Sequence, residues 1–227
     1  MRIALIHALE DSVAPSRKAF ADNWPEAFTF DLLDTSLSSD RAHVGFLRAD
    51  IYRRFEDLGR YASGTTGKGG DTAGILFTCS AFGPAIDAVK SMLPIPVLRP
   101  NESAFRTALK KGRRIGLIVT FRPSAMTLTQ ELQDIASANG AQLDVKTVVV
   151  EGALEALQRG DSERHDTLAR EAALELSSNC DCLILGQFSL ARAKTVIAKT
   201  IKHIPIITTP DAAVQELREM IATQKGQ

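Results

Sequence analysis

The sequence is poor in cysteine and tryptophan, and neither charge sign is in excess. Its 227 residues include 3 cysteines and 1 tryptophan, and 27 Lys and Arg balance 27 Asp and Glu. With so few cysteines, a disulfide framework like that of small secreted domains is not expected. Without net charge, no field favours nucleic acid or an acidic lipid surface. We therefore expect a small-molecule ligand, no nucleic-acid partner and no membrane partner.

Long hydrophobic runs are also missing near the start of the chain. The first apolar run, Ile3 to Ile6, is followed at once by His7 and then by acidic residues. A signal peptide needs about 7–15 apolar residues, and a membrane-spanning helix needs about 20. These absences predict a protein of the reducing cytoplasm. Cys180 and Cys182 have no second ligand pair nearby for a zinc site, so we expect two ordinary thiols and no metal.

Short apolar runs rich in β-branched residues alternate with longer amphipathic segments along the chain. This alternation is typical of an α/β fold in which helices cover both faces of a parallel sheet. The expected strands are residues 2–7, 28–33, 74–78, 95–98, 114–120, 143–150, 182–186 and 204–208. The clearest expected helices are residues 44–61, 124–139, 163–178 and 191–202.

The segment SGTTGKGGD, Ser63 to Asp71, invites comparison with a phosphate-binding loop. Such a loop requires Ser or Thr directly after its lysine, but Gly69 follows Lys68 here. The segment also precedes an expected strand instead of following one. We therefore expect a flexible surface connection.

The chain repeats itself at a nearly constant offset. RIALIHALEDS from Arg2 matches RIGLIVTFRPS from Arg114, 112 residues later, and ILFTCSAF from Ile75 matches LILGQFSL from Leu183, 108 residues later. Each member of the second pair is followed by an expected helix and by a strand that begins with Ile-Pro. Two matches in the same order indicate that one α/β unit is present twice.

The repeat predicts two pseudo-symmetric lobes, each a mainly parallel sheet flanked by helices. Residues 1–99 with 207–227 would form one lobe, and residues 100–206 the other. Ligands of open parallel sheets bind beyond the carboxyl ends of the strands. We therefore expect the active site in the cleft between the lobes, where Cys79 and Gln187 would approach from opposite sides.

Cys79 lies just after an expected strand and just before an expected helix. Unsatisfied N–H groups and the helix dipole at such a position can lower the pKa of a thiol from about 8.5 to roughly 3.5–7.5. The N–H groups of Ser80, Ala81 and Phe82, with the hydroxyls of Thr78 and Ser80, would form a cradle for a carboxylate or an oxyanion. Position alone leaves equally open a Cys79 that is only a small buried hydrophobe.

These residues carry a family resemblance. FTCSAFGPAIDAVKSMLPIPVLRPNESAF, followed by RIGLIVTF, LILGQFSLA and PDAAV, resembles the aspartate/glutamate/hydantoin racemase superfamily, with its glutamate racemases, maleate isomerases and arylmalonate decarboxylases. The resemblance implies a cofactor-independent, metal-free isomerase that acts on a small carboxylic acid or amino acid. In the family's racemases, one cysteine removes the α-proton and a second returns a proton to the opposite face. Cys79 matches the first cysteine, and Gln187 stands where the second is expected.

The glutamine excludes a racemase of the two-thiol kind, because an amide neither takes nor gives a proton usefully near neutrality. Cys180 and Cys182 lie at the start of the strand and Gln187 lies after its end, so these thiols cannot substitute for the missing one. A lone Cys79 leaves three chemistries open: proton transfer with a non-thiol partner, cis–trans isomerisation by addition to a double bond, and protonation after decarboxylation. A carboxylate-binding protein without activity is a further alternative. The arylmalonate decarboxylases themselves carry their single cysteine at the position of Gln187.

The remaining candidates lie in the loops after the expected strands. His7 is the candidate catalytic partner of Cys79 because it titrates near neutrality, although a hydrogen-bonded structural histidine is the simpler interpretation. The resemblance assigns Thr120 and Gln187 to carboxylate binding. Asn101 is expected to cap a helix with its side chain. Further substrate-binding candidates are Ser12, Phe121, Phe188 and Ser189, with core packing equally open for Phe82, Phe121 and Phe188. The oligomeric state, including a homo-oligomer, is left open.

Overall fold

Parallel strand pairing organises the chain into two sheets in the computed structural model, which describes residues 1–225. One unit comprises Met1–Pro100 together with the chain from Ala213 onward, and the other comprises Asn101–Ala212. The second boundary falls six residues beyond the expected one at 206, because the last strand of the chain pairs within the second sheet. Within the described residues, no helix is both long and apolar enough to cross a membrane.

The first unit contains a sheet in the order β2-β1-β4-β5, all parallel, with the short β3 antiparallel to β4. Its elements are β1 (Arg2–His7), η1 (Glu10–Ser12), α1 (Val13–Asn23), β2 (Phe28–Leu33), α2 (Ser36–Val44), α3 (Ala49–Ser63), β3 (Thr66–Gly67), β4 (Gly70–Phe77), η2 (Ser80–Phe82), α4 (Gly83–Met92) and β5 (Val97–Leu98). Here η marks a 3₁₀ helix. The last helix, α10 (Thr209–Lys225), spans the boundary at Ala212.

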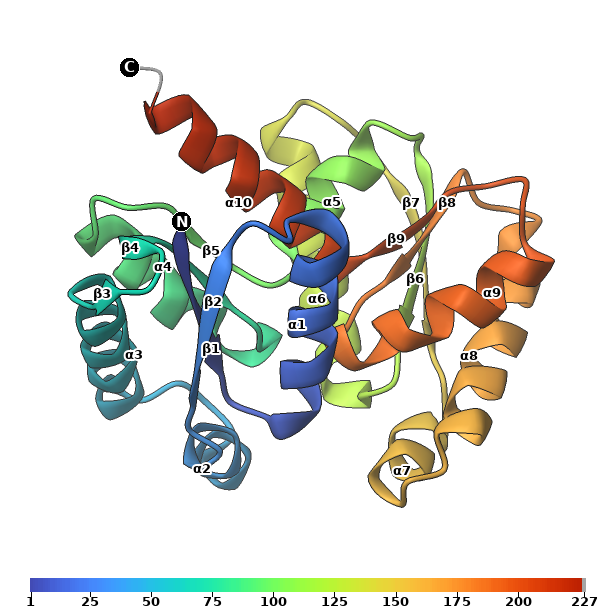
Figure 1. Cartoon of the computed structure of the whole chain (residues 1–227). Helices are drawn as coiled ribbons and strands as arrows, with labels where there is room; N and C mark the ends of the chain where they lie inside the picture. Colours follow the sequence, from blue (N-terminus) through green and yellow to red (C-terminus); the bar gives the residue numbers. More distant parts are fainter. Residues whose placement is uncertain (226–227) are drawn as a thin grey trace. The chain divides into compact units, whose positions relative to one another are not determined.

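The second unit contains a parallel sheet in the order β7-β6-β8-β9 (Figure 1). Its elements are α5 (Glu102–Leu109), β6 (Arg114–Val119), α6 (Arg122–Ala138), β7 (Asp144–Val149), α7 (Ala153–Gln158), α8 (Ser162–Ser177), β8 (Cys182–Leu185), η3 (Phe188–Ala193), α9 (Lys194–Thr200) and β9 (Ile206–Thr208). The eight expected strands are all present, with ends that differ by a few residues. The α/β fold with two parallel sheets is thus confirmed.

The internal repeat appears in the structure as an identical strand order and pairing register. Ala4 of β1 pairs with Ile75 of β4, and the matching residues of the second sheet, Gly116 and Leu183, also pair. The next pair of strands, β4 with β5 and β8 with β9, repeats this correspondence. Because a one-residue slip would turn every side chain to the other face, the shared register places equivalent sequence positions at equivalent points of each sheet.

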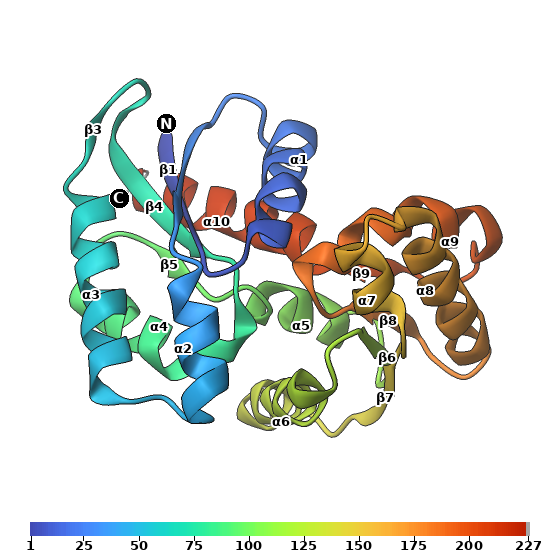
Figure 2. The same ribbon diagram turned by 90° about the horizontal axis from the view of Figure 1, so that it is seen from below.

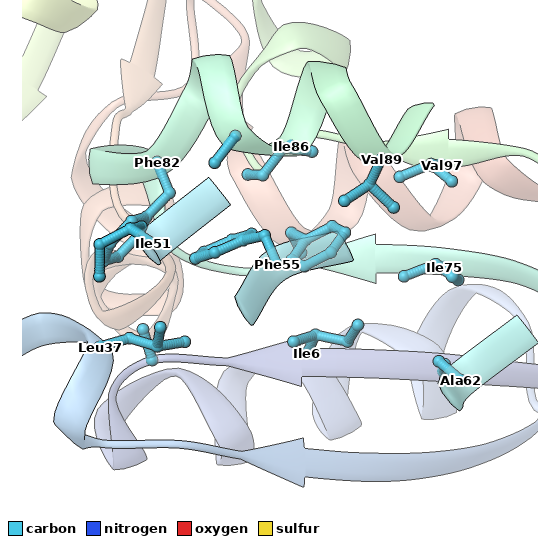
Figure 3. Packing of buried hydrophobic residues seen from close by; sticks show 14 residues of the cluster. Ile6, Leu37, Ile51, Phe55, Ala62, Ile75, Phe82, Ile86, Val89 and Val97 are labelled. Carbon is cyan, nitrogen blue, oxygen red and sulfur yellow. The ribbon is translucent and has the colours of Figure 1, made fainter. Parts of the chain in front are cut away.

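The core of the first unit lies between the sheet and α2, α3 and α4, while α1 and α10 cover the opposite face (Figure 2). Figure 3 shows Phe55 of α3 between Ile86 of α4 and Ile6 of β1. The Phe55 ring lies 5.2 Å from the ring of Phe77 and 4.8 Å from that of Phe82, measured between centroids. These aromatic contacts join a helix, a strand and the turn that follows Cys79.

The sheet of the second unit is buried on both faces, as its nearly continuous apolar strands predict. Ile118 and Leu183 face a cluster formed with α8 and α9, whereas Leu117 and Ile184 face a cluster formed with α5 and α6. This alternation along each strand follows from the two-residue period of β structure.

The SGTTGKGGD segment is a correction. It connects α3 to β4 at the surface as expected, but it contains regular structure that the sequence did not predict, namely the antiparallel β3–β4 hairpin. Gly69 and Gly70 both have a φ of 91° at the turn, a conformation that favours glycine. The glycines that the sequence presents as a sign of flexibility thus make a tight reversal.

We predict that Phe55→Ala destabilises the first unit by about 3–5 kcal/mol, since it removes a buried ring and leaves a cavity between three elements. Phe46→Ala is the matched control, because Phe46 is 61% exposed. Urea unfolding followed by fluorescence of Trp24, which lies in the same unit, measures both changes. Equal effects of the two substitutions would contradict the assignment of Phe55 to the core.

Candidate functional site

Cys79 lies at the carboxyl end of β4, at the residue that begins the η2 turn. Its backbone is extended, with φ −118° and ψ 121°, and its side chain is half-buried. The backbone N–H of Ala81 and the side chain of Ser38 both interact with the sulfur, and the Ser38 hydroxyl donates its proton to the carbonyl of Ala8 at 2.8 Å. Ser38 belongs to α2, so the thiol is held by its own turn and by a neighbouring helix.

Burial raises the pKa of the Cys79 thiol above its ordinary value, and the interactions with Ala81 and Ser38 oppose this shift without outweighing it. The expected pKa depression is therefore wrong for this environment. The sulfur lies among mainly apolar walls, which include Leu37 and Phe55 and leave no room for a water molecule. Because these walls solvate a thiolate poorly, Cys79 carries its proton at neutral pH.

His7 is fully buried and hydrogen-bonded at both ring nitrogens. Its Nε2 lies 2.9 Å from Asp31 Oδ1, and its Nδ1 lies 2.9 Å from Thr78 Oγ1 and 3.3 Å from Ser12 Oγ. Asp31 in turn accepts two hydrogen bonds from the Arg17 guanidinium, at 2.7 and 3.0 Å. A polar chain thus runs from the surface arginine to the hydroxyls of Ser12 and Thr78.

The proton positions in this chain follow from the groups that it contains. A carboxylate only accepts, so the proton of neutral His7 is on Nε2 and Nδ1 accepts from the Thr78 hydroxyl. Ser12 donates its own hydroxyl proton to the carbonyl of Leu9 at 2.7 Å. Burial lowers the pKa of His7, although the hydrogen bond to Asp31 raises it in part. His7 therefore holds Ser12 and Thr78 in place as a neutral ring, and its part in proton transfer stays a prediction.

Gln187 occupies the position in the second unit that Cys79 occupies in the first. It follows β8, begins the η3 turn and has the same extended backbone, with φ −137° and ψ 148°. Its Oε1 accepts hydrogen bonds from the backbone N–H and the hydroxyl of Thr120, both at 2.7 Å. These two bonds fix the orientation of the amide and leave its N–H₂ side without a partner among the described residues.

Asn101 supports this segment in a way that the sequence does not reveal. It stands at the start of α5, but its side chain does not cap the helix as expected. Its Nδ2 donates instead to the carbonyl of Gly186 at 2.7 Å. The residue directly before Gln187 is therefore tied to α5.

The other candidates divide by exposure. Ser80 and Ser189 are half-buried and Ala81 is exposed, so these residues can meet a ligand. Phe121 is 45% exposed. The rings of Phe82 and Phe188 are buried. Phe82 can therefore contribute its backbone N–H, but not its ring, to the predicted cradle.

Two residues of the site escaped sequence reasoning, namely Asp31 and Ser38. Asp31 interrupts the apolar strand FTFDLL, which follows the strand that ends in His7. A carboxylate at such a place could have predicted the contact between Asp31 and His7. Ser38 lies in α2, whose many polar residues conceal its helical period. No cluster of three or more metal-ligating side chains occurs within residues 1–225.

Residues 61–217 match the sequence pattern of the Asp/Glu/Hydantoin racemase family. No curated protein sequence matches the chain. Three similar solved structures show the same fold. The allantoin racemase from Klebsiella pneumoniae is 17% identical with a TM-score of 0.74, over 99% of this chain and 89% of that one. Glutamate racemase RacE1 from Bacillus anthracis is 17% identical with a TM-score of 0.69, over 98% and 82%. Glutamate racemase from Aquifex pyrophilus is 22% identical with a TM-score of 0.62, over 96% and 83%.

The lowered pKa of His7 predicts a loss of stability in mild acid. The unfolded chain takes up a proton on His7 as the pH falls below 6.5, whereas the folded protein resists protonation until a lower pH. The stabilising contribution is thus complete above pH 6.5 and is lost as the pH falls through this window, by at most about 1.4 kcal/mol per pH unit.

His7→Gln is expected to flatten the decline of unfolding free energy between pH 6.5 and the onset of carboxylate titration. His43→Gln, at an exposed position of α2, is the control and should leave the slope unchanged. Urea unfolding at a series of pH values measures the slopes. The same slope in wild type and His7→Gln would show that His7 is not held neutral.

Proposed function

The chain belongs to the Asp/Glu/Hydantoin racemase family, and from that membership we propose a cofactor-independent, racemase-like isomerase with Cys79 as its proton-carrying group. Its substrate is a small carboxylic acid or amino acid. Membership of the family supports the class of enzyme. The specific reaction and the role of each residue belong to the proposal.

The proposal rests on one observation, namely that equivalent positions of the two units hold different side chains. The third strand of each sheet, β4 or β8, is followed by an extended residue and then by a 3₁₀ turn. The first unit has a thiol there and the second has an amide that Thr120 holds in place. A thiol can transfer a proton near neutrality and an amide cannot, so Cys79 is the proton carrier and Gln187 is a hydrogen-bond donor to the substrate.

The surroundings of Cys79 supply groups that would bind the acid. The backbone N–H of Ser80 lies in the first turn after the strand, and the half-buried hydroxyl of Ser80 lies beside it. Backbone N–H groups at the start of a turn stabilise a carboxylate, and they stabilise an enediolate more strongly because it carries more charge. Thr78 and Ser12 stand behind this turn, held by the buried His7.

The protonation state of Cys79 determines which step it can perform. Removal of the α-proton needs the thiolate, so this step should accelerate as the pH rises towards the raised pKa of Cys79. Delivery of a proton to carbon needs the thiol, which is the resting form. In isomerisation, Cys79 therefore first loses its proton to water and then, as the thiolate, removes the α-proton of the substrate.

The resting thiol and the locked amide favour a second candidate, decarboxylation of an arylmalonate-type diacid. Breaking the bond to one carboxylate releases carbon dioxide and leaves its electron pair on the α-carbon as an enediolate. Cys79 then donates its proton to that carbon and recovers a proton from water. One proton donor is enough for this reaction, whereas inversion needs acid and base on opposite faces.

We predict that Cys79→Ala lowers turnover by about 10²–10⁴-fold, the range for loss of a general acid or base. Cys180→Ala is the matched control, since this thiol is buried before β8, away from the end that bears Gln187. The probes are L-aspartate, L-glutamate, allantoin and phenylmalonate. NMR in D₂O follows loss of the α-proton signal, and carbon dioxide release identifies decarboxylation. Undiminished turnover in Cys79→Ala would reject the role of the thiol, and binding of a probe without turnover would indicate a carboxylate-binding protein.

Gln187→Cys tests whether the absence of a second thiol limits inversion of the substrate. It supplies the second thiol that the family pattern contains, so α-proton exchange with inversion of L-aspartate, L-glutamate or allantoin should increase. Gln187→Ser is the control, because it removes the amide and adds no thiol. Chiral chromatography of the products measures inversion. An equal response of the two variants would show that the second thiol is not what limits inversion.

A further inference from the structure

A cleft of about 540 Å³ lies in the second unit between α8 and the η3–α9 segment. Its walls carry three cationic side chains, Arg170 of α8, Arg192 of η3 and Lys199 of α9. We propose that this cleft binds a small organic anion with a phosphate or carboxylate group, at a site separate from Cys79.

Arg170 is the main reason for this assignment. It is half-buried, and its Nε atom is shielded from solvent without a hydrogen-bond partner among the described residues. Buried N–H groups are nearly always paired, so an unpaired one in the wall of a cleft calls for an acceptor from a ligand or from solvent. A guanidinium meets carboxylate and phosphate groups with two parallel hydrogen bonds, which suits it to either anion.

The acid that lies one turn from Arg170 on the same side of its helix already has partners. Asp166 lies one turn before Arg170, at the i−4 position. Its Oδ1 accepts from Arg192 Nε at 2.9 Å and from His165 Nδ1 at 2.7 Å. Asp166 therefore orients Arg192, and it forms no ion pair with Arg170.

The cationic groups gather toward one end of the cleft. Helices α8 and α9 pack on the same face of the sheet, and each connects to a parallel strand, so the two helices run in the same direction. Arg170 and Lys199 both lie beyond the Asp166–Arg192 pair along this direction. The exposed Glu163 lies about two turns earlier on α8. An anion is therefore attracted to the end that holds Arg170 and Lys199.

The size and lining of the cleft indicate an organic ligand instead of a bare ion. Ligand sites typically measure about 300–1,000 Å³, and this cleft lies within that range. The hydroxyls of Thr167 and Thr200 provide neutral hydrogen-bonding groups, and Val196 provides an apolar wall. Glycerol 3-phosphate and citrate are suitable probes, because they present a phosphate and carboxylates on small carbon frames.

The experiment is calorimetric titration of the full chain with glycerol 3-phosphate, citrate and inorganic phosphate at constant ionic strength. At least one of the two organic probes should bind saturably, and whichever binds more tightly identifies the anion class. Arg170→Gln should raise its Kd about tenfold or more, the loss expected for a charge-assisted hydrogen bond. Arg164→Gln is the control, because Arg164 is an exposed residue of the same helix outside the cleft lining, and it should leave the Kd unchanged.

Two further measurements distinguish binding at Arg170 from binding elsewhere on the protein. The NMR signal of the Arg170 Nε–H group in the unmodified protein should shift on titration, which requires no variant to fold. Cys79→Ser should leave the Kd unchanged, because the carboxylate site proposed at Cys79 is distinct. The proposal is overturned if neither organic probe binds at millimolar concentration, if Arg170→Gln and Arg164→Gln weaken binding equally, or if the Arg170 signal does not move.

Discussion

The shared register of parallel strand pairing is the constraint on which the rest of the structure depends. Ala4 with Ile75 and Gly116 with Leu183 are equivalent pairs in the two sheets. Because the register is the same, the residues after β4 and β8 leave their sheets at equivalent points and begin equivalent turns. The apolar side chains that alternate between the two faces hold this register, since a slip would bring polar groups into the core. Packing of these apolar side chains within the sheets thus determines where Cys79 and Gln187 lie.

The same apolar packing controls the protonation of the site. Walls that include Leu37 and Phe55 disfavour a thiolate at Cys79, and burial likewise disfavours a charged His7. The first unit therefore presents two titratable groups that are both neutral in the resting protein. The interactions of the sulfur with Ala81 and Ser38 lower the pKa of Cys79 in part and so limit the cost of forming the thiolate. A neutral thiol that can be deprotonated suits the proton transfer that we propose for Cys79.

The sequence predicted the strands, the repeat and the correspondence of Cys79 with Gln187, because all three depend on local apolar patterns. It did not predict the direction of the Cys79 pKa shift, because this direction depends on burial by side chains such as Leu37 of α2. That helix is rich in Ser and charged residues and gives a weak periodic signal. The Asp31–His7 contact and the Asn101–Gly186 contact were also missed, since each joins side chains to groups distant in sequence. The hairpin at Gly69 was missed because glycine permits both a tight turn and a mobile loop.

The central claim is that Cys79 is a protonated, proton-transferring thiol in the resting protein. Ultraviolet absorption of the thiolate is measured against pH in two proteins, Cys180→Ala and the double variant Cys180→Ala/Cys79→Ser. The difference between the two curves gives the titration of Cys79, without a contribution from Cys180, the more exposed of the other two thiols. The account predicts an apparent pKa for Cys79 above about 8.5, the value of an unperturbed cysteine, with the thiol form dominant at neutral pH. A pKa below about 7 would contradict the account, because Cys79 would then be a resting thiolate.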